Sequence, residues 1–254
     1  MEDQEGIDRL FLELASESRL DILRELQTKG LKMRELARRL DLTATEAFRQ
    51  LKRLTEASLV QRQPEGSYTI APYGKLVLQL SSSLEFVFKH REYFSTHDLS
   101  RLPYAFVNRI GELSQAKLSM ETMENISKGE QMIGQAEQYI WAMVEGPSNE
   151  LMTPTVAEQS RRGVKYRFLV PERLLPAGSG PPGTAQDFEA RGLSDIPAII
   201  ALTEKEAGVF FRFIGGRADY AGFLAKDPSS LNWTKDLFLY YWDKGKRSPQ
   251  ASHL

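Results

Sequence analysis

The chain has 254 residues and a formal net charge of −1, with 26% charged and 41% hydrophobic residues. This composition is typical of a globular protein and the length favours two domains, while the nearly neutral charge argues against a protein that coats polyanions in general. The chain has no cysteine and only three histidines, which excludes disulfides, thiolate catalysis and Cys-bound zinc, so neither a metal site nor a cofactor is expected. No apolar run is long enough to span a membrane, and the acidic start MEDQEGIDRL lacks the apolar core of a secretion signal, so we expect a cytoplasmic protein.

Residues 1–75 have the pattern of a helix-turn-helix with a wing. Apolar residues recur at helical spacing over 7–14, 20–26 and 33–40. The sequence Thr43-Ala44-Thr45-Glu46 is a capping box that opens a helix over about 44–57. Two β-rich runs then flank a Pro/Gly turn and predict a hairpin. Helices and a hairpin in this order form a winged helix, which lays its second helix in the major groove of double-stranded DNA.

Positive charge is concentrated in this region. Between residues 31 and 63, eight Lys or Arg residues stand against four acids, which makes a local basic face on a neutral protein. Arginine can bond guanine and glutamine can bond adenine, whereas cations further along the helix suit phosphates. The alternatives are a solvated charged helix in a helical bundle and a plain surface hairpin. The candidate DNA-contacting residues are Thr43, Thr45, Glu46, Arg49, Gln50, Lys52 and Arg53 around the second helix, and Arg62 in the wing.

A helical connector over 76–112 follows the wing. Leu76, Leu80, Leu84, Val87 and Phe88 keep helical spacing to about residue 93. A long apolar helix that leaves a winged helix is either a dimer helix or packs on its own second domain, and the pattern does not choose between these partners. A homodimer would double the phosphate contacts and fix the spacing of two half-sites.

Residues 113–247 are predicted to form an α/β domain, and residues 248–254 a tail. Strand, helix and strand follow one another, which indicates a βαβ unit and a parallel sheet with a right-handed crossover. The Gly/Pro-rich run 177–183 is predicted to be a flexible connector, because it lacks the Gly-Lys-Ser/Thr of a phosphate loop. Strands are predicted over 116–122, 139–144, 164–170, 196–202, 208–214 and 220–225, and helices over 123–136, over 154–162 and from residue 227 onward.

A ligand-sensing domain needs a pocket with an apolar wall and a few polar anchors. Aromatic residues and arginines on or near the predicted strands fit this need, because arginine can hold a carboxylate or phosphate of a small-molecule effector. Alternatively, the aromatic residues are core and the arginines are surface. No acid pair, nucleophile with a base, or metal cluster stands out, so we do not expect an enzyme. The candidate ligand-binding residues are Trp141, Arg167, Arg212, Tyr220 and Phe223.

Residues 10–75 resemble the winged-helix domains of ArsR-type and related archaeal regulators. The run Glu56-Ala57-Ser58-Leu59-Val60 corresponds to the EAGLV that enters the wing in those domains. Ser58 replaces the usual glycine, which predicts a less sharp helix end. The metal-sensing members place Cys and His ligands in this domain, and this segment has neither, so metal sensing is not implied.

Residues 115–243 resemble the middle domain of the archaeal methanogenesis regulators of FilR type. This resemblance implies a phospholipase-D-like α/β sensor fold, related to the sensor half of the TrmB-type sugar regulators. Phospholipase-D enzymes need a His-x-Lys motif, and none of the three histidines here is followed by one, so catalysis is not implied. The resemblance is carried by Asp219-Tyr220-Ala221-Gly222-Phe223, Lys226-Asp227-Pro228, Trp233, Leu237-Phe238 and Tyr240-Tyr241-Trp242.

The sequence therefore predicts an α+β winged helix followed by an α/β domain, in a transcriptional regulator that binds operator DNA and is controlled by an effector or by dimerisation. One alternative is an enzyme whose winged helix serves only protein contacts. Another is a DNA-binding adaptor without a ligand. The operator, the effector and the direction of control stay open, because activators and repressors share this arrangement.

Overall fold

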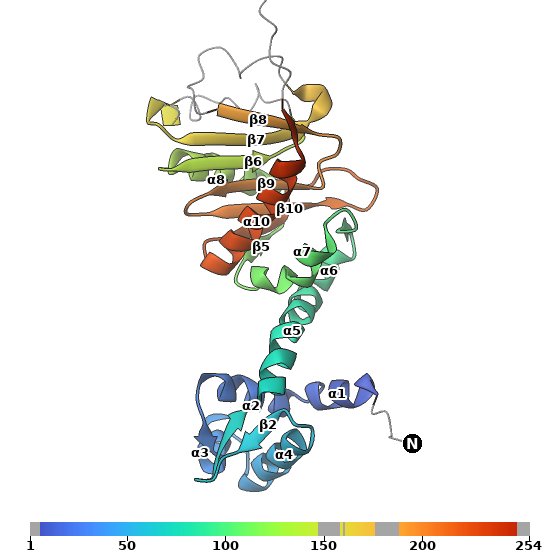
Figure 1. Cartoon of the computed structure of the whole chain (residues 1–254), viewed down its shortest axis with the longest axis vertical. Helices are drawn as coiled ribbons and strands as arrows, with labels where there is room; N and C mark the ends of the chain where they lie inside the picture. Colours follow the sequence, from blue (N-terminus) through green and yellow to red (C-terminus); the bar gives the residue numbers. More distant parts are fainter. Residues whose placement is uncertain (1–5, 147–157, 160, 176–187, 248–254) are drawn as a thin grey trace, which may run out of the picture. The chain divides into compact units, whose positions relative to one another are not determined.

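The structure is a computed structural model that describes residues 6–146, 158–159, 161–175 and 188–247. The chain divides into two compact units, residues 1–82 and residues 83–254 (Figure 1). The boundary between them falls inside the helix α5 (Pro72–Lys89), so the predicted connector 76–112 contributes residues to both units.

The first unit is a winged helix, as the sequence predicts. In chain order its elements are α1 (Ile7–Leu14), α2 (Glu17–Thr28), β1 (Leu31–Lys32), α3 (Met33–Arg39), α4 (Ala44–Glu56), β2 (Val60–Arg62), β3 (Ser67–Ile70) and the first part of α5. Helices α3 and α4 form the helix-turn-helix pair, and β2 and β3 form the wing hairpin, in which Gln61 pairs with Thr69. The strand β1, which the sequence pattern does not predict, adds to the hairpin beside β3.

Apolar side chains from α2, α3, α4 and the wing meet in one core. Leu23, Leu36 and Leu51 are completely buried there. Gly74 lets the start of α5 approach this core closely, because a Cβ at position 74 would lie 2.2 Å from the carbonyl oxygen of Leu59. The helix-turn-helix therefore packs on this core through one face of α4, and the opposite face of α4 does not contact the core.

The second unit is built on a mixed sheet of nine strands. Its elements after α5 are α6 (Arg91–Phe94), β4 (His97–Asp98), α7 (Tyr104–Asn108), η1 (Ile110–Leu113), β5 (Lys117–Ser119), α8 (Thr122–Gly134), β6 (Tyr139–Met143), β7 (Lys165–Pro171), η2 (Glu172–Leu174), β8 (Phe188–Leu193), β9 (Ala198–Thr203), β10 (Ala207–Phe213), β11 (Gly222–Ala225), α10 (Pro228–Lys244) and β12 (Lys246–Arg247). The strand order is β12-β8-β7-β6-β9-β10-β11-β5, and β4 also pairs with β10.

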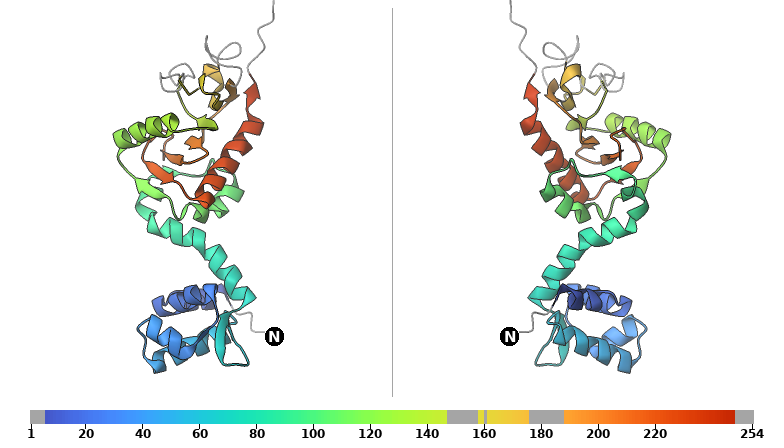
Figure 2. Two further views of the ribbon diagram at one scale, coloured as in Figure 1. Left: turned by 90° about the vertical axis from the view of Figure 1, so that its left-hand side faces the viewer. Right: turned by 90° about the vertical axis from the view of Figure 1, so that its right-hand side faces the viewer.

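Helices cover both faces of this sheet. Figure 2 shows α8 and α10 on opposite sides of it. On one face, Trp233, Leu237 and Phe238 of α10 pack in a large core with strand residues such as Met143. On the other face, the side chains of Tyr166 and Phe168 form a second core. Successive side chains along a strand alternate between the two cores, because they point to opposite faces of the sheet.

The prediction of a parallel sheet holds only for part of this unit. The pairs β6–β7 and β7–β8 are parallel, whereas β9 joins β6 and β10 in antiparallel fashion and β11 joins β10 and β5 in the same way. The reason is local: Thr203–Ala207 reverses the chain between β9 and β10, and such a short connection can join only antiparallel neighbours. The predicted loop 177–183 and most of the predicted helix 154–162 lie outside the described residues.

Candidate nucleic-acid interface

The helix α4 begins with a complete capping box. The backbone N–H of Glu46 donates to Thr43 Oγ1 at 3.2 Å, and the Glu46 carboxylate accepts from the Thr43 backbone N–H at 3.0 Å and from its hydroxyl at 2.8 Å. The hydrogen bonds from the Thr43 side chain and backbone lower the pKa of the Glu46 carboxyl. Both residues were predicted to contact DNA, and in the structure both are exposed and engaged in the cap.

The inward face of α4 differs from the prediction at one residue. Gln50 was expected on the outer face as a reader of adenine, but its side chain is buried with 9% exposure. Its Oε1 accepts a hydrogen bond of 3.0 Å from Arg19 Nη1 of α2. The helical period explains the error, because position 50 lies three residues after Ala47 and four before Leu54, which are both buried.

Arg53, another predicted contact, is tied to the first helix. Its Nη2 lies 2.5 Å from Glu13 Oε1 of α1. Glu13 also pairs with Arg19 Nε at 3.0 Å, and Arg19 donates to the backbone carbonyl of Leu12 at 2.6 Å. Burial lowers the pKa of Arg19, and the neighbouring Glu13 opposes this shift. These bonds brace α4 against α1 and α2, so Arg53 has a structural partner as well as an exposed side chain.

The outward face of α4 carries a row of exposed residues at helical spacing. Thr45, Phe48, Arg49 and Lys52 all lie on this face. Arg49 makes no hydrogen bond or ion pair with any residue in the described part of the chain, and Lys52 makes only the within-helix pair with Glu56 at 3.7 Å. Arg62, in the wing strand β2, is exposed as well. The guanidinium group of Arg49 and the ammonium group of Lys52 therefore lie on the same exposed face of α4.

Phe48 is a residue of this face that the sequence reasoning missed. Its side chain is 56% exposed, on the same face of α4 as Arg49. The signal was present in the sequence, because positions 45, 48, 49 and 52 form one helical stripe opposite the stripe of 47, 50, 51 and 54.

The five predicted ligand residues of the second unit have different surroundings. Arg167 lies between the rings of Trp141 and Trp242, at 5.1 and 5.2 Å from their centroids. Arg212 donates to the carbonyl of Ile196 at 2.9 Å and pairs with Glu145.

The two other candidates, Tyr220 and Phe223, differ in their surroundings. Tyr220 is half-buried, and burial together with the charge of Glu145 raises the pKa of its phenol. Phe223 is 1% exposed and packs among Phe86, Tyr93 and Phe94, so it lies in the core, as Trp141 does.

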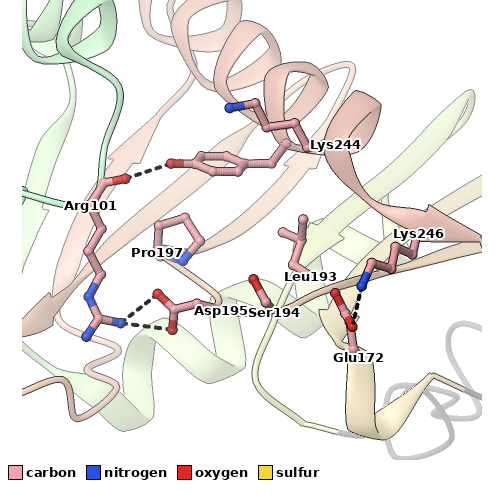
Figure 3. Close-up of a pocket in the computed structure, with 9 residues that line it drawn as sticks. Arg101, Glu172, Leu193, Ser194, Asp195, Pro197, Lys244 and Lys246 are labelled. Atoms are coloured by element: carbon pink, nitrogen blue, oxygen red, sulfur yellow. Dashed lines mark hydrogen bonds and ion pairs between the residues drawn. The ribbon is translucent and has the colours of Figure 1, made fainter.

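A hollow of about 380 Å³ lies elsewhere in the second unit (Figure 3). It opens where β7 and β8 end, and none of the five predicted ligand residues lines it. The residues that line it are Arg101, Glu172, Leu193, Ser194, Asp195, Pro197, Tyr241, Lys244 and Lys246.

No group of three or more His, Asp or Glu side chains within the described ranges could hold a metal ion. Within the same ranges, every helix is too short or too polar to cross a membrane.

Several solved structures resemble the chain in fold. TrmBL2, described as an archaeal chromatin protein with a novel mode of DNA binding, is 16% identical over 95% of this chain and 100% of its own, with a TM-score of 0.42. NucT from Helicobacter pylori is 9% identical over 50% of this chain and 92% of its own, with a TM-score of 0.38. Nuc from Salmonella typhimurium, a phospholipase D family member, is 13% identical over 50% of this chain and 91% of its own, with a TM-score of 0.34.

Comparison by sequence reaches only the first part of the chain. No curated protein matches it significantly. Residues 7–91, which include the whole winged helix and α5, match the family described as the HVO_A0261 N-terminal domain.

Proposed function

We propose that this protein binds double-stranded DNA through the outward face of α4 and acts as a transcriptional regulator. The observation that carries this proposal is the exposed stripe of Thr45, Phe48, Arg49 and Lys52 on a capped, internally braced helix in the second position of a helix-turn-helix. The stripe brings a guanidinium, an ammonium group and an aromatic ring together on one exposed helix face, and contacts with base edges and phosphates use such groups.

Each residue of the stripe has a chemical role in this proposal. The Arg49 fork matches O6 and N7 of guanine, and the Phe48 ring and the Thr45 methyl group suit the methyl group of thymine. Lys52 and the wing residue Arg62 are placed for phosphates, which add affinity without reading sequence. Gln50 takes no part, because it is buried against Arg19.

We further propose that the chain is an archaeal ArsR-like regulator with a middle domain of the methanogenesis-regulator (FilR) type. The residues that support this finer assignment are Glu56 to Val60 at the wing and Asp219 to Trp242 near the end of the second unit. On this proposal the chain is a cytoplasmic homodimer and not an enzyme, and its second unit senses an effector that changes DNA affinity.

The test is DNA binding by the full chain. A preferred site is first selected from a random duplex library, and its affinity is then measured by fluorescence anisotropy over a range of salt concentrations. The double variant Arg49→Ala with Lys52→Ala should bind at least tenfold more weakly, with a salt slope lower by about 1 to 2. The control is Lys128→Ala with Lys226→Ala, a partly exposed and an exposed lysine of the second unit. Equal affinity and salt slope for a folded Arg49 and Lys52 double variant would refute the proposal.

A further inference from the structure

We propose that the hollow at the ends of β7 and β8 is a binding site for a small organic anion with a carboxylate or phosphate group and several hydroxyl groups. The strands β7 and β8 run parallel, with Pro171 opposite Leu193 at their ends. Glu172 follows β7 directly, and Ser194 and Asp195 follow β8. Ligands of open α/β sheets bind outside the carboxyl ends of parallel strands, which is where this hollow lies.

The opposite wall comes from the end of the chain. Tyr241 and Lys244 lie in the last turns of α10, and Lys246 begins the strand β12, which pairs with β8. Figure 3 shows Lys244 at the top, Lys246 at the right and Arg101 at the left of the other labelled residues that line the hollow. Segments far apart in the sequence are thus gathered at a single place, as the walls of a binding site must be.

The charges around the hollow are unevenly balanced. Arg101 Nη1 contacts both carboxylate oxygens of Asp195, at 2.8 and 2.7 Å. On the other side, Lys246 Nζ lies 3.1 Å from Glu172 Oε2. Lys244 has no acidic partner among the residues that the structure describes: its Nζ contacts the Tyr240 hydroxyl at 2.5 Å and lies 4.1 Å from the centre of that ring. The lining of the hollow therefore carries three basic and two acidic side chains, an excess of one positive charge.

The walls are held in place before any ligand enters. The Tyr241 hydroxyl donates to the backbone carbonyl of Arg101 at 2.9 Å, which fixes the Arg101 segment to α10. Gly192 lets β8 pack closely on the turn after β7, because a Cβ there would lie 3.0 Å from the Glu172 Cα. Leu193 and Pro197 are buried and supply apolar surface between the charged groups. A preformed site of this kind loses little binding free energy to reorganisation.

These features define the class of ligand. The cations of the lining, Lys244 above all, suit a carboxylate or phosphate, and the carboxylates of Glu172 and Asp195 suit hydroxyl donors on the same molecule. The volume, at the lower end of the range for ligand pockets, excludes large molecules. Lys244 also interacts favourably with the end of the α10 dipole, but that role does not account for the hollow and its two flanking ion pairs.

The experiment measures binding to the full chain by isothermal titration calorimetry and thermal shift. The probes are glycerol 3-phosphate and malate, and glycerol is the neutral control of matched shape. We expect at least one anion to bind and glycerol not to bind, and the two anions tell a phosphate site from a carboxylate site. Lys244→Gln should weaken binding about tenfold or more, because one charge-assisted hydrogen bond is lost. Lys226→Gln, at a lysine outside the hollow, should not change it.

Failure of both anions to bind, or equal binding by Lys244→Gln, would overturn the proposal. The hollow would be the effector site of the proposed regulator only if anion binding changed the affinity for DNA. Anion binding and DNA binding are therefore tested separately. Arg49→Ala with Lys52→Ala should still bind the anion at full affinity. A bound anion that leaves the DNA affinity of the wild type unchanged would support the site and reject its role as an effector site.

Discussion

At the scale of single residues, one face of α4 packs in the core of the first unit, and the opposite face is the one that we propose contacts DNA. Gln50 looks like a base reader by its chemistry, yet its position in the helical repeat places it with Ala47 and Leu54 in the interior. Phe48 looks like a core residue by its chemistry, yet its position places it outside with Arg49. In both cases the position in the helical repeat determines whether the side chain is buried or exposed, because it fixes the face of the helix on which the side chain lies.

Phe48→Ala tests whether the exposed ring reads DNA. Loss of its contact with a thymine methyl group should weaken binding to the selected site about tenfold and relax the preference for thymine at one position. The stability of the fold should change by less than about 0.5 kcal/mol, because the ring is mostly in solvent. Affinity and base preference are measured by anisotropy on substituted duplexes.

The matched control for this variant is Tyr104→Ala, which removes a 79% exposed ring from the second unit. It should leave both DNA affinity and base preference unchanged. An unaltered thymine preference in Phe48→Ala would show that the ring does not contact a base.

Contacts between residues that are far apart in the sequence could not be predicted from the sequence pattern. The ring of His97 is buried and stacks flat on Tyr93, with ring centroids 3.7 Å apart. Its Nε2 lies 3.0 Å from Asp219 Oδ2, which is 122 residues away in the chain. No periodicity links these two positions, because the contact depends on how β4 and the segment before β11 meet at the sheet.

At the scale of elements, the winged helix was predictable because its signals are local. The capping box at Thr43 and the Pro/Gly turn of the wing act within a few residues. Ser58 was expected to weaken the end of α4, yet it takes the left-handed conformation that glycine usually supplies, with φ of 59°. The N–H of Leu59 then donates to the carbonyl of Leu54 at 2.9 Å, so the helix ends sharply without glycine.

The sheet of the second unit was only partly predictable. The strands β6 and β7 have long apolar runs and were predicted from the sequence. The strands β4 and β12 have two residues each, so only their pairing with neighbouring strands defines them. The strand β8 alternates polar and apolar residues less clearly. The hollow was missed for the same reason, because its walls come from residues 101, 172, 194 and 244, and only the folded sheet brings them together.

Glu204, in the turn between β9 and β10, supports a pH-dependent prediction for this sheet. Its carboxylate accepts from the backbone N–H groups of Glu137 at 2.8 Å and Gln138 at 3.2 Å, at the start of β6. Burial alone would raise the pKa of Glu204, but these backbone donors outweigh it and lower the pKa below its ordinary value of 4.5. The charged form therefore stabilises the fold above that value, and this stability is lost as the pH falls through the lowered pKa.

Glu204→Gln should reduce the free energy of unfolding at pH 7 by about 1 to 2 kcal/mol, because an amide group would face N–H donors. The difference from the wild type should shrink below about pH 4.5. Urea unfolding followed by tryptophan fluorescence measures it, since Trp141, Trp233 and Trp242 all lie in the second unit. Glu206→Gln, which breaks only the exposed pair with Lys226, should cost less than about 0.5 kcal/mol. A gap between Glu204→Gln and wild type that stays constant with pH would contradict this account.

At the scale of the whole molecule, the first unit exposes large apolar side chains on both α1 and α5. The helix α1 is amphipathic, yet none of its residues is buried, and Ile7 is 68% exposed. On α5, Leu76 and Leu80 are 53% and 67% exposed. Ile7, together with Tyr73 of α5, lines one hollow of about 640 Å³, so the two apolar surfaces are continuous. Continuous exposed apolar surface of this kind is typical of a protein–protein interface.

A second copy of the chain is the partner that DNA recognition favours, because two recognition helices must be spaced to meet successive major grooves about 34 Å apart. We predict that Leu76→Glu with Leu80→Glu converts a dimer to a monomer in light scattering coupled to size exclusion. The same variant should bind the selected DNA at least tenfold more weakly, because each half-site is then bound alone. Ile214→Glu, at a 67% exposed position of the second unit, is the control and should leave both properties unchanged. A wild-type chain that is monomeric with and without DNA would rule out the dimer, and a dimer that survives both charges would place its interface on other residues than these.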